Sequence, residues 1–311
     1  MSSEIPAASA RLADDRPWRR LRATVARASE PGLRVEVAPD RVLLRQEGRP
    51  VLFAVRQVGH QGMWYRRVPC AFRSPVTPPR AQLARDIAGS GAEDERAARW
   101  AHWFWRELAV SPDGPVHGGS WLIEADDAMS RTNWRRLCDE DADEMYMSWI
   151  PPTLPPVLLR PLSTADSARV KAYRKLAAAG TLPPLLLWWI SGLNCDVLLD
   201  GHDRLVAAVA EGIAPRVLRL ARPLSQRTNS LWLDATIARH EELAAAHAHV
   251  PNEARDGRLN RNLGVALQNL DELLGPTLAH PVPGGADGWT AEARRWAPGW
   301  NPDPAELASQ G

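Results

Sequence analysis

Two short apolar runs, separated by a single turn, restrict this chain more than any other feature of its 311 residues. They are Leu185–Ile190 and Cys195–Leu199, with Ser191-Gly192 between them. Runs of this length that lack a helical repeat and are bounded by turn residues are typical of buried strands. Pro183-Pro184 precedes the first run and sets where that strand can begin. The pair therefore predicts the buried centre of a small α/β domain.

The flanking residues extend this pattern to strand, helix, strand, strand, loop, helix, strand. Before the runs, Val157–Leu159 is short and apolar, and Ser163, with an acidic residue three positions later, is typical of a helix start. That helix is expected to end at Gly180. After the runs, a second helix is expected to reach about Glu211, and a strand to follow over Pro215–Leu220. The buried face of the first helix is predicted to contain Val170, Tyr173, Leu176 and Ala177.

The loop Asp200-Gly201-His202-Asp203-Arg204 joins the second buried strand to the second helix. Glycine after a strand lets the backbone approach a ligand closely, and the following helix N-terminus offers free N–H groups and a partial positive charge. That combination accepts phosphate. Arg204 adds a fork of donors and His202 a switchable one. A purely structural interpretation is also open, in which Asp200 caps the helix and Arg204 pairs with Asp203 or Asp200.

The ordered set resembles a known superfamily. Gly180-Thr181-Leu182-Pro183-Pro184-Leu185-Leu186-Leu187, followed by Val197-Leu198-Leu199-Asp200-Gly201-His202-Asp203-Arg204-Leu205-Val206-Ala207-Ala208, is similar to the ParB-like nuclease domain of the ParB/sulfiredoxin superfamily. The resemblance covers about residues 156–222, so most of the chain lies outside it. It implies a loop that binds nucleotide phosphates, as in CTP-dependent clamps, ATP-dependent sulfiredoxins and free-serine kinases.

For this chain the resemblance implies an ATP- or CTP-type nucleotide, with Mg²⁺, at Asp200, Gly201, His202, Asp203 and Arg204. Gly201, His202 and Arg204 would line the phosphates, and Asp200 would orient Arg204 or help to hold Mg²⁺. If the domain is catalytic, the implied residues are Asp200, His202 and Arg204. No metal site built from protein ligands alone is predicted.

Three departures from the superfamily narrow the function. The loop has no cysteine, and Cys195 falls on a strand expected to be buried, which argues against sulfinic-acid repair. Residues 223–275 have helical patterns but no compact helix-turn-helix, which argues against chromosome partition. A kinase base within the domain would have to be Asp166 or Asp196. From outside the domain, the candidates are Glu124 and the acidic run Asp139–Glu144.

The whole chain is expected to be an α+β protein with five segments. These are a basic N-terminal arm with a short helix (1–30), an α+β region (31–150), the ParB/sulfiredoxin-like domain (156–222), a helical extension (223–279) and an extended Pro/Gly/Trp-rich tail (280–311). Within the second segment, strands are predicted between Leu33 and Phe72 and over Ser120–Glu124. A helix with an aromatic stripe is predicted over Asp94–Val110.

Charge and composition limit the partners. With 38 basic and 37 acidic residues, the net charge of +1 argues against a surface built to grip DNA. No apolar run approaches the length of a bilayer span, and residues 1–30 lack a signal-peptide core, so we expect a cytoplasmic protein without a membrane partner.

The favoured function is a nucleotide-binding module for sensing or for binding a protein partner. The alternatives are a Mg²⁺-dependent nucleotide hydrolase or phosphotransferase and, last, a DNA-binding protein or nuclease.

Overall fold

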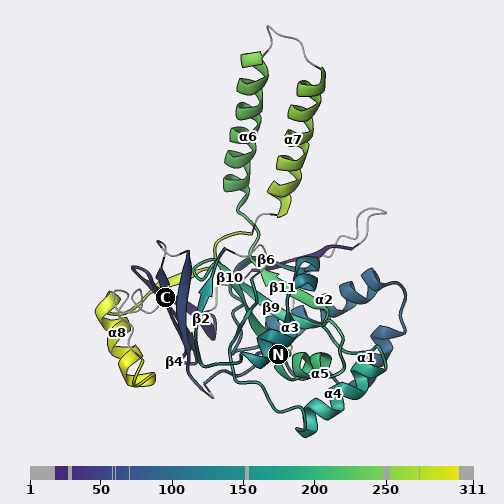
Figure 1. Ribbon diagram of the computed structural model, residues 1–311, viewed down its shortest axis with the longest axis vertical. Coiled ribbons are helices and arrows are strands. Elements are labelled where there is room, and N and C mark those ends of the chain that lie inside the picture. The colour runs from purple at the N-terminus through teal and green to yellow at the C-terminus, as the bar shows by residue number, and fades with distance from the viewer. Residues whose placement is uncertain are drawn as a thin grey trace. The chain divides into compact units, whose positions relative to one another are not determined.

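The computed structural model describes residues 18–26, 30–57, 59, 61–69, 71–150, 154–247, 253–272 and 274–300. The chain divides into two compact units. One contains Met1–Ala221 with Thr277–Gly311, and the other is Arg222–Pro276, so the second unit is an insertion between two parts of the first. Figure 1 shows the elements of both units.

The protein is α+β, as predicted, with two six-stranded mixed sheets and eight α-helices in the described part of the chain. In order across the first sheet, the strands are β1 (Arg20–Val25), β6 (Gly119–Ala125), β11 (Val217–Ala221), β9 (Leu185–Ile190), β10 (Cys195–Asp200) and β8 (Val157–Leu158). Across the second they are β12 (Ala279–Pro281), β2 (Leu33–Ala38), β3 (Arg41–Gln46), β4 (Arg49–Gln57), β5 (Gly62–Arg67) and β7 (Glu144–Ser148).

The predicted order of elements after residue 156 is confirmed: β8, α4 (Ala168–Ala178), β9, β10, α5 (His202–Ala210) and β11. The strand β9 coincides with the first apolar run, and every residue of β10 is buried, including Cys195. The strand β10 is antiparallel to β9 and parallel to β8, while β11 is parallel to β9. The same sheet also includes β6 and β1, so strands from residues 18–150 and from 156–222 share one sheet.

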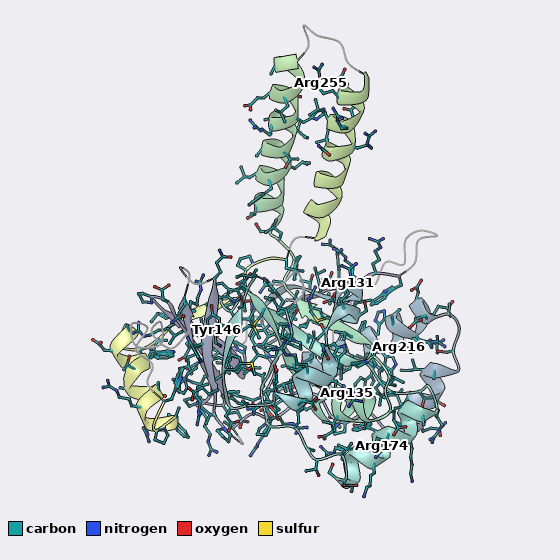
Figure 2. All side chains as sticks on the ribbon, in the orientation of Figure 1. Arg131, Arg135, Tyr146, Arg174, Arg216 and Arg255 are labelled. Carbon is teal, nitrogen blue, oxygen red and sulfur yellow. The ribbon has the colours of Figure 1, made fainter. Side chains whose placement is uncertain are left out.

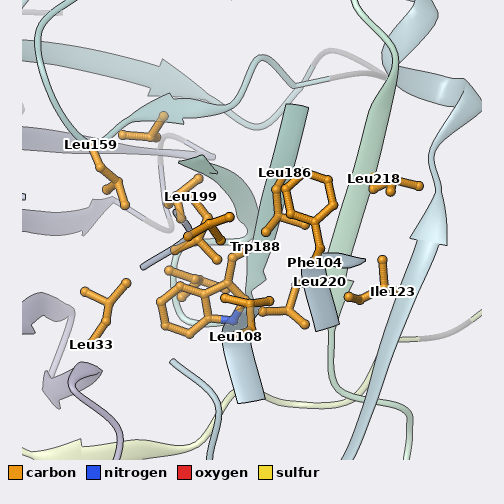
Figure 3. Packing of buried hydrophobic residues seen from close by; sticks show 14 of the residues in the cluster. Leu33, Phe104, Leu108, Ile123, Leu159, Leu186, Trp188, Leu199, Leu218 and Leu220 are labelled. Atoms are coloured by element: carbon orange, nitrogen blue, oxygen red, sulfur yellow. The ribbon is translucent and has the colours of Figure 1, made fainter. Parts of the chain in front are cut away.

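Apolar side chains cover both faces of the first sheet. Alternate residues of β9 point to opposite faces, so Leu186 and Trp188 belong to one cluster and Leu185 and Leu187 to another. The helix α2 (Glu93–Val110) covers the first face with its predicted aromatic stripe. On the other face lie α3 (Trp134–Asp139), α5 and the short 3₁₀ helix η2 (Asp127–Arg131). Figure 3 shows the first cluster, with Phe104 and Leu108 of α2 among Leu186, Trp188, Leu218 and Leu220.

Two local predictions are wrong, each for a different physical reason. The basic helix expected in residues 1–30 is the strand β1, where Leu21 and Ala23 are buried while neighbouring arginines remain accessible. This alternation has the period of two that a strand requires. The helix α4 begins one turn later than expected, because the hydroxyl of Ser167, not Ser163, accepts the backbone N–H of Val170. The end of α4 agrees with the prediction, since Gly180 follows it with a φ of 67°.

The tail was also predicted wrongly, because its described residues are folded. The strand β12 pairs with β2, and α8 (Gly285–Trp296) packs against the second sheet, as Figure 1 shows. Trp289 is fully buried, with its ring centre 5.4 Å from that of Phe53, and its indole N–H donates to the Val42 carbonyl at 3.0 Å. Residues 301–311 lie outside the described part.

The second unit contains the two expected helices, α6 (Gln226–His247) and α7 (Glu253–Glu272). The chain enters and leaves this unit at one point. The Gly275 N–H donates to the Arg222 carbonyl at 2.7 Å, and Pro223 forms an isolated β-bridge with Leu274. The remaining helix, α1 (Ala81–Ala88), lies in the first unit.

Candidate functional site

A pocket of about 570 Å³ lies at the N-terminus of α5 and contains all five residues of the predicted loop. Its walls come from four separate stretches of sequence. They are Phe72, Arg73, Ser74, Val76 and Pro78; Arg160 and Ser163; Ser167, Arg169 and Tyr173; and Asp200 to Arg204. The structure therefore brings the predicted loop together with three arginines that the sequence interpretation did not select.

Gly201 makes the turn from β10 into α5. Its φ of 110° lies in the left-handed region, and an added Cβ would come within 2.8 Å of Leu185 Cδ2 and 2.9 Å of Arg204 Nη2. Only glycine fits both constraints. As the N-cap of α5, Gly201 offers no side chain to the first-turn N–H groups. These groups, with the positive end of the helix dipole, lie beside the pocket.

Arg204 belongs to the core rather than to a free phosphate clamp. Its side chain is buried, and its Nη2 atom donates to Asp200 Oδ2 at 2.7 Å and to the Pro184 carbonyl at 2.9 Å. The guanidinium carbon lies 6.0 Å from the ring centre of Phe104 and 5.9 Å from that of Tyr173. Burial lowers the pKa of Arg204, but Asp200 and Tyr173 raise it more, so the group remains charged. The Asp200–Arg204 pairing agrees with the structural interpretation left open above. The capping role of Asp200 in that interpretation is wrong, because the N-cap of α5 is Gly201 and no side chain caps the helix.

Asp200 is similarly engaged. Its second oxygen, Oδ1, accepts a hydrogen bond from the Ser74 hydroxyl at 2.7 Å. Asp200 therefore orients Arg204 and links the Phe72–Pro78 loop to the end of β10. A metal ion or a substrate proton would have to compete with both of these partners.

Asp203 lies in the first turn of α5 and faces two arginines across the pocket. Its Oδ1 atom accepts from Ser163 Oγ at 2.7 Å and from Arg160 Nη2 at 3.0 Å, and its Oδ2 atom lies 3.6 Å from Arg169 Nη1. Burial raises the pKa of Asp203, but the hydrogen bonds from Ser163 and Arg160 and the arginine charges outweigh it. The net pKa lies below its usual value, so Asp203 is ionised at neutral pH.

In the described part of the chain, His202 places a buried polar atom without a hydrogen-bond partner in the lining of the pocket. It is 1% exposed, and its Nε2 atom has no hydrogen-bond partner among the residues that the structure describes. Burial lowers the pKa of His202 well below 6.5, and three arginine charges lower it further. These arginines are Arg160, Arg67 and Arg204. The imidazole is therefore neutral at neutral pH, and a ligand atom in the pocket could satisfy it.

Arg73, Arg160 and Arg169 are the pocket cations with the most accessible side chains. Arg73 and Arg169 are exposed, and Arg160 is half-buried. A sequence signal existed for Arg160. It follows β8, which runs parallel to β10, so the carboxyl ends of both strands meet at one edge of the sheet. No comparable local signal marks Arg73, which comes from a loop far away in the sequence.

The other candidate bases do not line the pocket. Asp196 is buried and accepts hydrogen bonds from Nε and Nη2 of Arg219, and Glu124 Oε1 lies 3.6 Å from Arg219 Nη1. Asp166 is exposed and pairs with Lys171. In the acidic run, Asp141 and Asp143 pair with buried Arg67. Within the described ranges, no group of three or more His, Cys, Asp or Glu residues could hold a metal ion.

Comparison with protein-family models, with curated proteins and with solved structures gives no significant match to this chain. The superfamily resemblance therefore stays a prediction. Among the described helices, none is long and apolar enough to cross a membrane.

Proposed function

We propose that the pocket at the α5 N-terminus binds the phosphates of a nucleotide. The observation that carries the proposal is the buried His202, whose Nε2 atom lacks a partner in the described structure, beside the uncapped first turn of α5. Backbone N–H groups at a helix start and a neutral imidazole N–H are both suitable donors to phosphate oxygens. The ParB/sulfiredoxin resemblance of the sequence implies a ligand of the same class.

The arginines divide into two roles in this proposal. Arg160, Arg169 and Arg73 would contact the phosphates, since their side chains reach the pocket without being part of the core. Arg204 would act indirectly by fixing Asp200 and the end of β10. ATP or CTP with Mg²⁺ is the proposed ligand class.

Binding is favoured over turnover by the state of the two loop carboxylates. Asp200 holds Arg204 and Ser74, and Asp203 holds Arg160 and Ser163, so both are already engaged as acceptors. A Mg²⁺-dependent hydrolase or phosphotransferase remains the alternative, and it would need one carboxylate to change partners. DNA binding or nuclease activity comes last, since the near-zero net charge gives it no support.

A thermal-shift series tests the proposal with ATP, ADP, CTP and GTP, each with and without Mg²⁺. A nucleotide at a hundred times its dissociation constant is expected to stabilise the wild type by about 2.7 kcal/mol. The double variant Arg160→Ala/Arg169→Ala should lose most of this shift. Arg174→Ala is the matched control. Arg174, labelled in Figure 2, lies on the same helix as Arg169. It pairs with Glu211 and does not line the pocket. An equal shift in wild type and double variant, or none with any nucleotide, contradicts the proposal.

The hairpin of α6 and α7 favours a second function, the binding of another protein chain. Four large apolar residues of α6 are exposed: Leu231 by 61%, Trp232 by 55%, Leu233 by 39% and Ile237 by 37%. Apolar patches of this kind mark interaction surfaces, and tryptophan is enriched at their energetic centres. The helix also carries both charge signs, with Asp234 between the apolar residues and Arg239 two positions after the last of them. We propose that this surface is covered by a second copy of the chain.

Light scattering during size-exclusion chromatography tests this contact. The wild type is expected to form a dimer in the micromolar range, and Leu231→Ser/Trp232→Ser is expected to be monomeric. Arg258→Ser, at an exposed position of α7, serves as the control and should leave the dimer unchanged. A monomeric wild type across that range would rule out a second copy as the partner.

A further inference from the structure

Asp203 occupies the position where an external anion would be expected. It lies in the first turn of α5, where the helix dipole favours negative charge. Its carboxylate accepts a hydrogen bond from Ser163 and another from Arg160, and it also faces Arg169. Hydroxyl, guanidinium and helix N-terminus are the donors that a phosphate would use. The carboxylate of Asp203 therefore already contacts the groups that would bind a phosphate.

The negative charge of Asp203 affects the binding of any phosphate that enters the pocket. A metal-free phosphate would meet a fixed like charge at close range, and two of the pocket arginines would already be partly neutralised. A divalent cation reverses that effect, because it can take oxygen ligands from a carboxylate and from phosphates together. Magnesium sites in proteins commonly use one or two carboxylates plus substrate phosphates. To take part in such a complex, Asp203 would exchange its hydrogen bond from Arg160 or Ser163 for a bond to the cation.

We propose that Asp203 is a specificity-determining residue that admits polyphosphates complexed with a divalent cation and rejects the same anions without it. The inference rests on the proposed phosphate-binding function and goes beyond it, since it assigns the ligand's charge state to one side chain. A purely structural role for Asp203, holding Arg160 and Ser163 against α5, predicts no such dependence on the cation.

The test measures binding of inorganic tripolyphosphate by calorimetry on the full chain, either saturated with Mg²⁺ or in the presence of EDTA. The wild type is expected to bind the Mg²⁺ complex at least about tenfold more tightly than the free anion. Asp203→Asn keeps the shape of the side chain and removes its charge. This variant is expected to bind the free anion at least about tenfold more tightly than the wild type does, and to lose most of the Mg²⁺ dependence.

Two further variants provide a control and a second neutral side chain at position 203. Glu211→Gln neutralises a carboxylate at the other end of α5, which pairs with Arg174, and it should bind like the wild type in both conditions. Asp203→Ser provides a second neutral side chain if the asparagine variant does not fold. Melting curves identify any variant that has unfolded.

The outcomes separate the two proposals. Equal binding of tripolyphosphate by the wild type with Mg²⁺ and with EDTA overturns the role of Asp203, while the phosphate site itself stands. Folded neutral variants that gain nothing in EDTA overturn it too. If neither wild type nor variants bind tripolyphosphate in any condition, the phosphate-binding function fails and the inference with it.

Discussion

Replacing Arg204 with alanine is expected to lower the free energy of unfolding by about 3–5 kcal/mol. The substitution leaves Asp200 buried without its charged partner, and it removes the donor to the Pro184 carbonyl. It also opens space between the rings of Phe104 and Tyr173. Urea unfolding followed by tryptophan fluorescence measures the change.

A double variant distinguishes the lost ion pair from a general packing defect. Arg204→Leu combined with Asp200→Asn removes both charges, so it should recover much of the stability that Arg204→Ala loses. Arg174→Ala, which breaks an ion pair of a half-exposed side chain, should cost no more than about 1 kcal/mol. If Arg204→Ala were as mild as Arg174→Ala, the buried pair would not organise the loop. Nucleotide-binding losses in Arg204→Ala therefore reflect damage to the fold as well as to the site.

The stability of the protein is expected to fall below about pH 6.5 because of His202. Burial lowers the pKa of His202 in the folded state, whereas the unfolded chain has the ordinary value. As the pH falls below that value, the unfolded state binds a proton and the folded state does not. The free energy of unfolding therefore decreases by at most about 1.4 kcal/mol per pH unit from this one group. The loss stops once the pH reaches the folded-state pKa.

Urea unfolding of wild type and His202→Gln between pH 7.5 and pH 5, as proposed assay limits, checks this contribution. Glutamine is uncharged throughout, so the variant should show a smaller slope below about pH 6.5, whatever its stability at neutral pH. The two curves should run parallel above that value. Parallel curves over the whole range would mean that the pKa of His202 is the same in the folded and unfolded states.

The sequence predicted the centre of the first unit well, because its signals are local. The apolar runs that became β9 and β10 could be buried only as strands, and Gly201 and Gly180 mark turns that need a left-handed residue. The aromatic stripe of α2 has an unambiguous helical spacing. Each of these elements is determined by residues within about one helical turn of each other or within a single strand.

What the sequence did not predict depends on distant partners. The strand β1 is a strand because it pairs with β6, about a hundred residues later, and the tail folds because Trp289 reaches the Val42 carbonyl. The candidate site shows the same limit. Its five loop residues were predicted as a group, but the burial of Arg204 depends on Phe104, Tyr173 and Pro184, which approach it only in the folded protein. The arginines now proposed to contact phosphate come from three other segments.

The second unit joins the rest of the chain only through a stem, the paired residues Arg222–Pro223 and Leu274–Gly275, so changes in the hairpin need not change the sheets. Since the chain leaves after β11 and returns before β12 through paired residues at 222–223 and 274–275, the hairpin can lengthen, shorten or change its sequence without altering a single strand pairing. Proteins with such a stem can acquire new partners by exchanging the insertion while the pocket is inherited unchanged. The same property makes residues 224–273 a natural place to graft a reporter domain, with its two ends fixed side by side.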